Sequence, residues 1–200
     1  MVSSVVETNL SDWKFLGHSV HSLSIIPEAH KTKTDEEKGP AILLIHGFGA
    51  STTHWRYNLP VLGKQYEVHA LDLLGFGKSS KPSGLAYGGP LWKDQIVAYV
   101  KEKIGRPTIL VGNSLGGYAA LASGAAMGPE AAGVVLLNAA GYFSEDKKTT
   151  KGTWATARKT VAGIFLKNAL LQRIIFENLR QPSTIKRTLN QVYIDTSNVD

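Results

Sequence analysis

The chain has 200 residues, of which 43% are hydrophobic and 19% charged, the composition of an ordinary globular protein long enough to bury one core. It contains no cysteine, which excludes disulfide bonds and thiolate chemistry, and no apolar run near the roughly 18 residues of a membrane-spanning helix. Residues 1–10 lack a basic region followed by an apolar one. No secretory signal is evident, and we expect a cytoplasmic protein, or a stromal one in a plastid-bearing organism.

The net charge of +6 is concentrated toward the C-terminal end of the sequence. Residues 1–140 hold 12 Lys and Arg against 11 Asp and Glu, whereas residues 141–200 hold 10 against 5. A basic tail can make peripheral contact with an anionic membrane, although a solvated helical surface is the simpler interpretation. No basic motif interleaved with aromatic residues is present, so we expect no nucleic-acid partner. The oligomeric state stays open.

The N-terminal part of the chain predicts two kinds of strand. Residues 13–26 alternate loosely between polar and apolar types, which favours an antiparallel hairpin at a sheet edge, and residues 30–39 predict a charged loop. Residues 41–45 are a continuous apolar run, as expected of a strand buried on both faces of a parallel sheet. Ser51 or Thr52 can cap the helix that follows.

The middle of the chain continues this alternation of strand and helix. Residues 67–71 form another buried run. Residues 78–90 are rich in Gly, Pro and Ser and predict a loop, with Lys78 and Ser79 on its surface. Residues 91–104 have apolar side chains at helical spacing and lead into the next strand.

The sequence around Ser114 has the strand–turn–helix pattern of a nucleophile elbow. A strand-type run at residues 108–111 meets a Gly-x-Ser-x-Gly motif, in which Gly112 and Gly116 flank Ser114. Side chains at these two glycines would collide with the neighbouring strand and helix. The turn places the Ser114 hydroxyl at the N-terminus of a helix, where negative charge is favoured. The alternative is a turn kept for structure alone.

Strands alternate with helices from residue 41 to residue 140, ending with a buried strand at residues 133–137. This alternation predicts an α/β fold with a doubly wound, mostly parallel sheet and helices on both faces. Ligands in such sheets bind at the carboxyl ends of the strands. Four polar side chains fall at or next to those ends: His46, Asp72, Ser114 and Asn138.

From residue 142 the pattern changes to helices without strands, predicted over residues 154–167, 169–179 and 184–193. We therefore expect two parts, an N-terminal core over residues 1–140 and a partial helical cap or lid over residues 141–200. A further set of core helices is the alternative, because an apolar stripe is present in either case.

Three motifs in this order resemble the α/β-hydrolase fold family: His-Gly-Phe-Gly at 46–49, Asp-Leu-Leu-Gly-Phe-Gly-Lys-Ser at 72–79 and Gly-Asn-Ser-Leu-Gly-Gly at 112–117. Their spacing agrees with that family across residues 13–140. The sequence around the first and last motifs is similar to that of the pheophytinase and chlorophyll-dephytylase-like hydrolases of photosynthetic organisms. Related esterases and C–C bond hydrolases share much of it.

The resemblance implies a serine hydrolase in which Ser114 attacks the carbonyl of a small hydrophobic ester, such as a phytyl ester of a chlorophyll derivative. It implies an oxyanion hole made by the backbone N–H groups of Phe48 and Leu115. It also implies a substrate site at three further positions: Gly47, Gly49 and Asn113. We expect no cofactor and no metal. We expect His46 to brace its loop and Asp72 to cap its turn.

The acid and histidine of the triad are the missing parts. In this family they follow the serine, but all six histidines of the chain precede Ser114. Asp146, Asp195 and Asp200 lie in or near the predicted cap and are poor candidates for the acid. We therefore expect an incomplete hydrolase whose C-terminal part is absent. Two alternatives stay open: a C–C bond or other hydrolase on the same scaffold, and a non-catalytic binding or scaffold protein.

Overall fold

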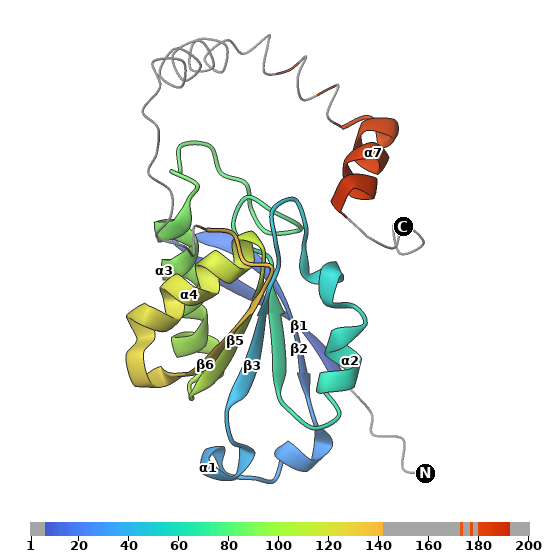
Figure 1. Cartoon of the computed structure of the whole chain (residues 1–200). Coiled ribbons are helices and arrows are strands. Elements are labelled where there is room, and N and C mark those ends of the chain that lie inside the picture. Colours follow the sequence, from blue (N-terminus) through green and yellow to red (C-terminus); the bar gives the residue numbers. More distant parts are fainter. Residues whose placement is uncertain (1–6, 142–172, 174–176, 178–179, 193–200) are drawn as a thin grey trace, which may run out of the picture. The chain divides into compact units, whose positions relative to one another are not determined.

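The computed structural model describes residues 7–141, 173, 177 and 180–192 (Figure 1). Contacts divide the chain into two units, Met1–Phe143 and Ser144–Asp200. In the second unit, helix α7 spans Pro182–Val192 and confirms the helix predicted over residues 184–193. The helix predicted over residues 154–167 and most of the one over 169–179 lie outside the described residues. The cap therefore stays a prediction.

Within the described residues, one six-stranded sheet has the order β1-β2-β4-β3-β5-β6 (Figure 1). Its strands β3, β4, β5 and β6 are mutually parallel, and the β1–β2 hairpin adds to β4 in antiparallel fashion. This arrangement confirms the predicted α/β fold with a mostly parallel sheet. The strands are Glu7–Phe15, His18–Ile26, Ala41–Ile45, Val68–Leu71, Thr108–Asn113 and Ala131–Leu137.

The predicted edge hairpin is confirmed, and β1 begins earlier than the alternation indicated. Two residues connect its strands, Leu16 at φ 51° and Gly17 at φ 77°. Two-residue hairpin turns with both residues in the left-handed region match the natural twist of the strands. Leucine rarely adopts this conformation, which is why the sequence carries no obvious turn signal there.

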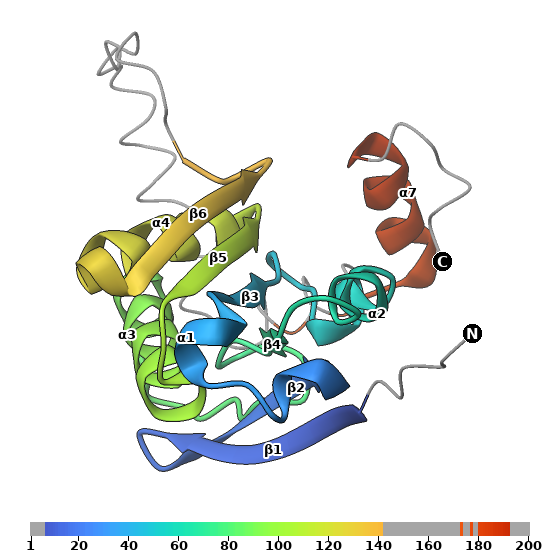
Figure 2. The ribbon, with the colours of Figure 1, turned by 90° about the horizontal axis from the view of Figure 1, so that it is seen from below.

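The sheet is covered on both faces. Figure 2 shows α3 (Gly89–Tyr99) and α4 (Leu115–Met127) on one side and α2 (Asn58–Leu62) on the other. Successive side chains of β3 alternate between two hydrophobic clusters, with Leu43 and Ile45 in the cluster under α3 and α4, and Ile42 and Leu44 in the other. This double burial explains why β3 is a continuous apolar run.

Three connecting segments differ from the sequence-based expectation. The segment predicted as a loop over residues 30–39 contains a short helix with a capping box, and the single helix expected after Ser51 divides into two short ones. The helix expected over residues 91–104 begins earlier and ends in a π-helical turn. The additional elements are η1 Glu28–His30, α1 Asp35–Lys38, η2 Thr52–Trp55, η3 Val100–Ile104 and η4 Gly128–Glu130.

Strand β6 is more exposed than predicted. Its last three side chains, Val135, Leu136 and Leu137, are 43%, 40% and 39% exposed, so the prediction of a buried strand was wrong for this end of β6. Strand β5 pairs with one edge of β6 and α4 packs against it. Among the described elements these two make the most extensive contact with β6, and the side chains at its carboxyl end are left partly exposed.

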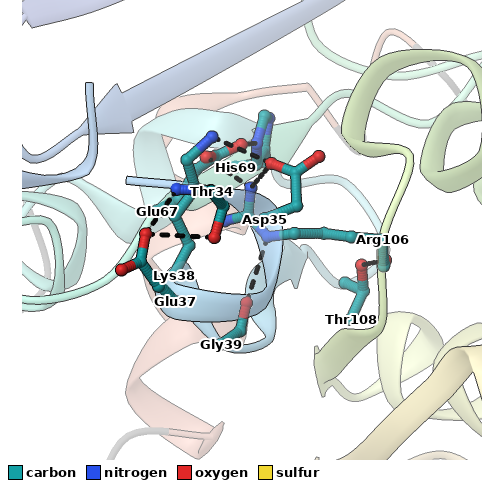
Figure 3. A network of polar contacts seen from close by, with 9 residues as sticks. All are labelled: Thr34, Asp35, Glu37, Lys38, Gly39, Glu67, His69, Arg106 and Thr108. Carbon is teal, nitrogen blue, oxygen red and sulfur yellow. Dashed lines mark hydrogen bonds and ion pairs between the residues drawn. The ribbon is translucent and has the colours of Figure 1, made fainter. Parts of the chain in front are cut away.

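A buried ionic network ties the amino ends of β4 and β5 together, near α1 (Figure 3). The Glu67 carboxylate contacts the His69 imidazole at 2.8 Å and the Arg106 guanidinium at 2.9 Å, and Arg106 Nε donates to the Gly39 carbonyl at 3.1 Å. Burial alone raises the pKa of Glu67, but His69 and Arg106 outweigh it and lower the pKa to about 2. The network anchors the end of the sheet opposite the carboxyl ends of the parallel strands.

Candidate active site

The parallel register brings the polar residues at the strand ends to one edge of the sheet. Strands β3 and β5 are neighbours, and Ile45 pairs with Gly112. His46 is the first residue after β3 and Ser114 is the first residue after β5, so the two residues lie at the same end of neighbouring strands. This edge is the one at which open α/β sheets bind ligands.

Ser114 holds a strained backbone conformation, with φ 52° and ψ −116°. Its N–H donates to the Leu137 carbonyl at 2.9 Å, and its own carbonyl accepts from Gly117 at 3.0 Å and Ala140 at 2.9 Å. Such a conformation costs on the order of 1–3 kcal/mol in a residue with a side chain and persists only where surrounding contacts enforce it. The Ser114 side chain makes no capping bond to α4, so its hydroxyl is not used by the helix.

The turn around Ser114 leaves no room for side chains, as predicted for both flanking glycines. A Cβ on Gly116 would lie 2.5 Å from the His46 carbonyl oxygen and closer still to that of Ile45. A Cβ on Gly112 would lie 2.6 Å from the Gly117 nitrogen. Only glycine allows α4 to approach β3 and β5 this closely, and that approach sets the position of the serine.

The loop after β3 lies directly against the serine. A Cβ on Gly47 would be 3.3 Å from the Ser114 Cβ and 3.1 Å from the Asn113 amide oxygen. Leu115 is the first residue of α4, so its N–H is one of the donors that a helix leaves unpaired. In the described part of the chain, no acceptor is found for the N–H of Phe48. Within the described residues neither N–H has a backbone acceptor, and the oxyanion hole of Phe48 and Leu115 stays a prediction.

Gly49 contributes in a different way from Gly47. It has φ 71° and nothing within 4 Å of the place where a Cβ would be, so the requirement there is conformational rather than steric. Asn113 packs its amide against Gly47 instead of standing free at the edge. The sequence placed both residues at the substrate site. In the structure Gly49 is part of the loop that follows β3, and Asn113 lies against that loop.

His46 is fully buried and both of its ring nitrogens are occupied. Nε2 accepts from the Leu73 N–H at 3.1 Å, so the proton is on Nδ1, which donates to the Gly47 carbonyl at 2.7 Å. Burial lowers the pKa of His46, although the Gly47 carbonyl and the Asp72 carboxylate oppose this shift. The imidazole is a neutral brace between two loops, which confirms the structural role expected for it.

Asp72 is also fully buried and organises two loops. One carboxylate oxygen accepts from the Thr52 N–H at 2.6 Å, the other from the Lys78 N–H at 2.7 Å. The predicted capping of its turn is confirmed. Ser79 was wrongly assigned to the surface: it is 2% exposed, donates to the Asp72 carbonyl at 2.7 Å and accepts from the His21 N–H at 2.9 Å. A stretch rich in Gly, Pro and Ser predicts a loop, but its composition does not show which distant residues a side chain in it will bind.

Gln95 of α3 supports the same loop and was missed in the sequence. Its side chain accepts from the Leu74 N–H at 2.9 Å and donates to the Asp72 carbonyl at 3.1 Å. Trp92 donates its indole N–H to the Leu74 carbonyl at 3.0 Å. Gln95 comes three positions after Trp92 and four before Tyr99, which places a polar residue on the apolar face of the helix. This placement was the sequence signal that could have identified Gln95 as a buried hydrogen-bonding residue.

An open pocket of about 320 Å³ lies beside Phe48. Phe48 is 79% exposed, and its ring meets the ring of Phe76 edge-on at 5.4 Å. Phe76 in turn contacts the ring of Trp92 at 5.8 Å. The pocket is lined by Phe48, Gly75, Phe76, Lys81, Tyr87 and Trp92.

In the described part of the chain, none of the hydrogen bonds of His46 and His69 reaches Ser114. His46 is committed to its two backbone partners, and His69 is held by Glu67 and Tyr99. His54 stacks on Trp55 at a centroid distance of 5.4 Å. Within the described ranges, no group of three or more His, Asp or Glu side chains could hold a metal ion, and no helix is long and apolar enough to cross a membrane.

A strained serine between a parallel strand and a helix, with a glycine-rich loop pressed against it, defines the α/β-hydrolase class of proteins. The model of the alpha/beta hydrolase family matches residues 42–191, and the chain belongs to this family.

Individual relatives differ in chemistry. The chloroplastic pheophytinase of Arabidopsis thaliana is 30% identical over 85% of this chain and 42% of its own length. The 2-hydroxymuconate semialdehyde hydrolase of Pseudomonas sp. strain CF600 is 36% identical over 54% of this chain and 39% of its own. A solved structure of a bacterial membrane phospholipase A superposes with a TM-score of 0.60, at 28% identity, over 70% of this chain and 42% of that one. The chain spans about two fifths of the length of these relatives.

Proposed function

We propose that the protein is a serine hydrolase that cleaves an ester of a hydrophobic substrate through an acyl-enzyme on Ser114. The observation that supports it most is the combination at the elbow: a serine at φ 52° whose side chain is not used by α4, with the Gly47 loop against its Cβ. A serine kept only for structure has no need of this strain, since glycine adopts the same backbone without cost.

The proposed reaction uses the groups around Ser114 in a defined order. The serine oxygen attacks the ester carbonyl carbon while its proton passes to a base, and the N–H groups of Phe48 and Leu115 stabilise the oxyanion. The intermediate then collapses to the acyl-enzyme and releases the alcohol, which takes up the proton. Water hydrolyses the acyl-enzyme by the same steps. The proposal assigns the base and its acid to residues outside this sequence.

For the substrate, we propose a phytyl ester of a chlorophyll derivative. Similarity to a chloroplastic pheophytinase along 85% of the chain supports this choice. The proposal also places the protein in the plastid stroma if the organism has plastids, and in the cytoplasm if it does not. Peripheral contact with the membrane through the basic residues 141–200 belongs to the same proposal, because a phytylated substrate partitions into lipid.

The test uses the full-length protein with 4-nitrophenyl esters and a fluorophosphonate probe. Wild-type protein should hydrolyse the esters and be labelled at Ser114, and Ser114→Ala should abolish both. Ser123→Ala is the matched control, because it removes a hydroxyl from the same helix, where Ser123 donates to the Ala119 carbonyl at 2.8 Å and lies 3.5 Å from the Lys93 carbonyl. Ester hydrolysis that survives in Ser114→Ala would overturn the proposal.

A C–C bond hydrolase is the second candidate, favoured by the 36% identity to 2-hydroxymuconate semialdehyde hydrolase. It predicts slow turnover of simple esters and fast cleavage of diketone-like acids, again dependent on Ser114. A non-catalytic binding protein is the third. It predicts that the fluorophosphonate probe leaves Ser114 of the native protein unlabelled.

A further inference from the structure

The pocket beside Phe48 combines an aromatic wall with one cation. Its volume of about 320 Å³ falls at the lower end of the range of roughly 300–1,000 Å³ for small-molecule sites. Four of its lining residues are aromatic, and Lys81 is the one charged residue among them. A pocket of this kind suits a ligand with an apolar body and one polar group.

The aromatic wall is held in place before any ligand arrives. The Trp92 indole is fixed by its bond to the Leu74 carbonyl at 3.0 Å, and the Tyr87 hydroxyl donates to the Pro82 carbonyl at 2.7 Å. The Tyr87 ring also packs on Gly75, where a Cβ would lie 2.8 Å from a ring carbon. Because these rings need little reordering, binding an apolar group there costs little conformational entropy.

Lys81 is positioned by the loop but not neutralised by it. Its ammonium donates to the Gly77 carbonyl at 2.6 Å and to the Ser79 carbonyl at 3.1 Å. An ammonium has three donors, so a third is left for a ligand. Among the residues that the structure describes, no carboxylate forms an ion pair with Lys81. A positive charge therefore stands at the edge of an aromatic pocket.

We propose that this pocket is a subsite for an anionic amphiphile, with the apolar body of the ligand against Phe76, Tyr87 and Trp92 and its carboxylate paired with Lys81. The inference rests on the proposed function and narrows its substrate class. Phe48 belongs both to the pocket wall and to the loop beside Ser114, so a ligand seated here extends from the ester that the serine attacks. The substrate is then a hydrophobic ester that carries a free carboxylate. The phytyl ester of a chlorophyll derivative has its acids esterified, so within ester hydrolysis by Ser114 the subsite favours a different ester.

A binding experiment tests the subsite without any turnover. Isothermal titration calorimetry on the full-length Ser114→Ala protein compares 4-phenylbutanoate with 4-phenyl-1-butanol, which share an apolar body and differ in charge. The anion should bind roughly tenfold more tightly, the discrimination expected of one charge-assisted hydrogen bond. Lys81→Met should abolish the preference and leave binding of the alcohol unchanged, whereas Lys81→Arg should keep it.

Two further variants make the result specific. Lys64→Met removes an exposed lysine next to α2 and should leave both affinities unchanged. Tyr87→Ala removes part of the aromatic wall and should weaken both ligands. The subsite is wrong if the anion binds no better than the alcohol, or if Lys81→Met keeps the preference while thermal unfolding shows it folded. Lys81-dependent binding without ester hydrolysis by the wild type would refute the proposed function alone, and hydrolysis without that binding would refute the subsite alone.

Discussion

His46 and Leu73 join two loops at the candidate active site: the imidazole Nε2 accepts the backbone N–H of Leu73 at 3.1 Å, across 27 positions of sequence. The other ring nitrogen donates to the Gly47 carbonyl, in the loop pressed against Ser114. Since both nitrogens are used, the ring has no free position at which to take a proton from the serine. Its effect on catalysis must come through the placement of the Gly47 loop.

His46→Ala should therefore lower the rate without changing its pH dependence. The Leu73 N–H would be left buried and unpaired, which costs about 1–3 kcal/mol, and the loop beside Ser114 would lose its brace. Urea unfolding gives the stability, and kcat against pH gives the profile. His18→Ala, in the β1–β2 hairpin, is the control. Loss of an ionisation from the pH profile of His46→Ala would instead make His46 a proton-transfer group.

Asp72→Asn tests whether one carboxylate organises both loops. An amide offers one oxygen and one NH₂, so either the Thr52 or the Lys78 N–H would face a donor at a distance set for an acceptor. We expect a loss of about 1–3 kcal/mol in unfolding free energy and faster proteolysis in residues 73–80. Asp94→Asn changes a carboxylate with 60% exposure and should alter stability by less than about 1 kcal/mol. Equal stabilities for the two variants would show that the Asp72 bonds contribute little.

Gly116→Ala should destabilise the protein and displace the elbow, because its new Cβ would meet the carbonyl oxygens of Ile45 and His46. Overpacking against rigid backbone costs about 1–3 kcal/mol or more. Gly133→Ala, in β6, is the matched control: its Cβ would find no atom nearer than 3.9 Å, and it should leave stability unchanged or slightly raised. The unfolding temperatures of the two variants, measured side by side with wild type, test this prediction. A Gly116→Ala protein as stable as wild type would contradict the packing argument.

Glu67→Gln tests the ionic network at the opposite end of the sheet. The folded pKa of Glu67, about 2, lies below the ordinary value of 4.5, so its ionised form stabilises the fold above pH 4.5. That stabilisation, about 3 kcal/mol from the shift, is lost as the pH falls through this interval. In denaturant unfolding, the free energy of unfolding of the wild type should be well above that of Glu67→Gln at neutral pH. The two values should converge toward about pH 2. Glu36→Gln, an exposed carboxylate on α1, should follow wild type. A gap that stays constant with pH would count against the ion pairs.

Local pattern was enough to predict the parts of the site that depend on neighbours in sequence. The run from Thr108 through Gly112 to the glycines after Ser114 specifies a strand, a tight turn and a helix, because each residue's conformational preference acts within a few positions. The continuous apolar run of β3 likewise predicted a strand buried on both faces, and the parallel order placed His46, Asp72 and Ser114 at one edge.

Partners far apart in sequence were decided by the tertiary structure alone. The link from His46 to Leu73, the burial of Ser79 and the support of Leu74 by Gln95 all join segments whose proximity follows from strand order and helix docking. The open surface of β6 has the same origin, because an apolar run specifies what a strand can bury and not what covers it. The amino-acid sequence by itself determined where Ser114, the proposed nucleophile, stands on a parallel sheet. The packing of distant segments decided which polar groups hold the loops around it, since hydrogen bonds form between groups that folding brings together and local periodicity carries no record of them.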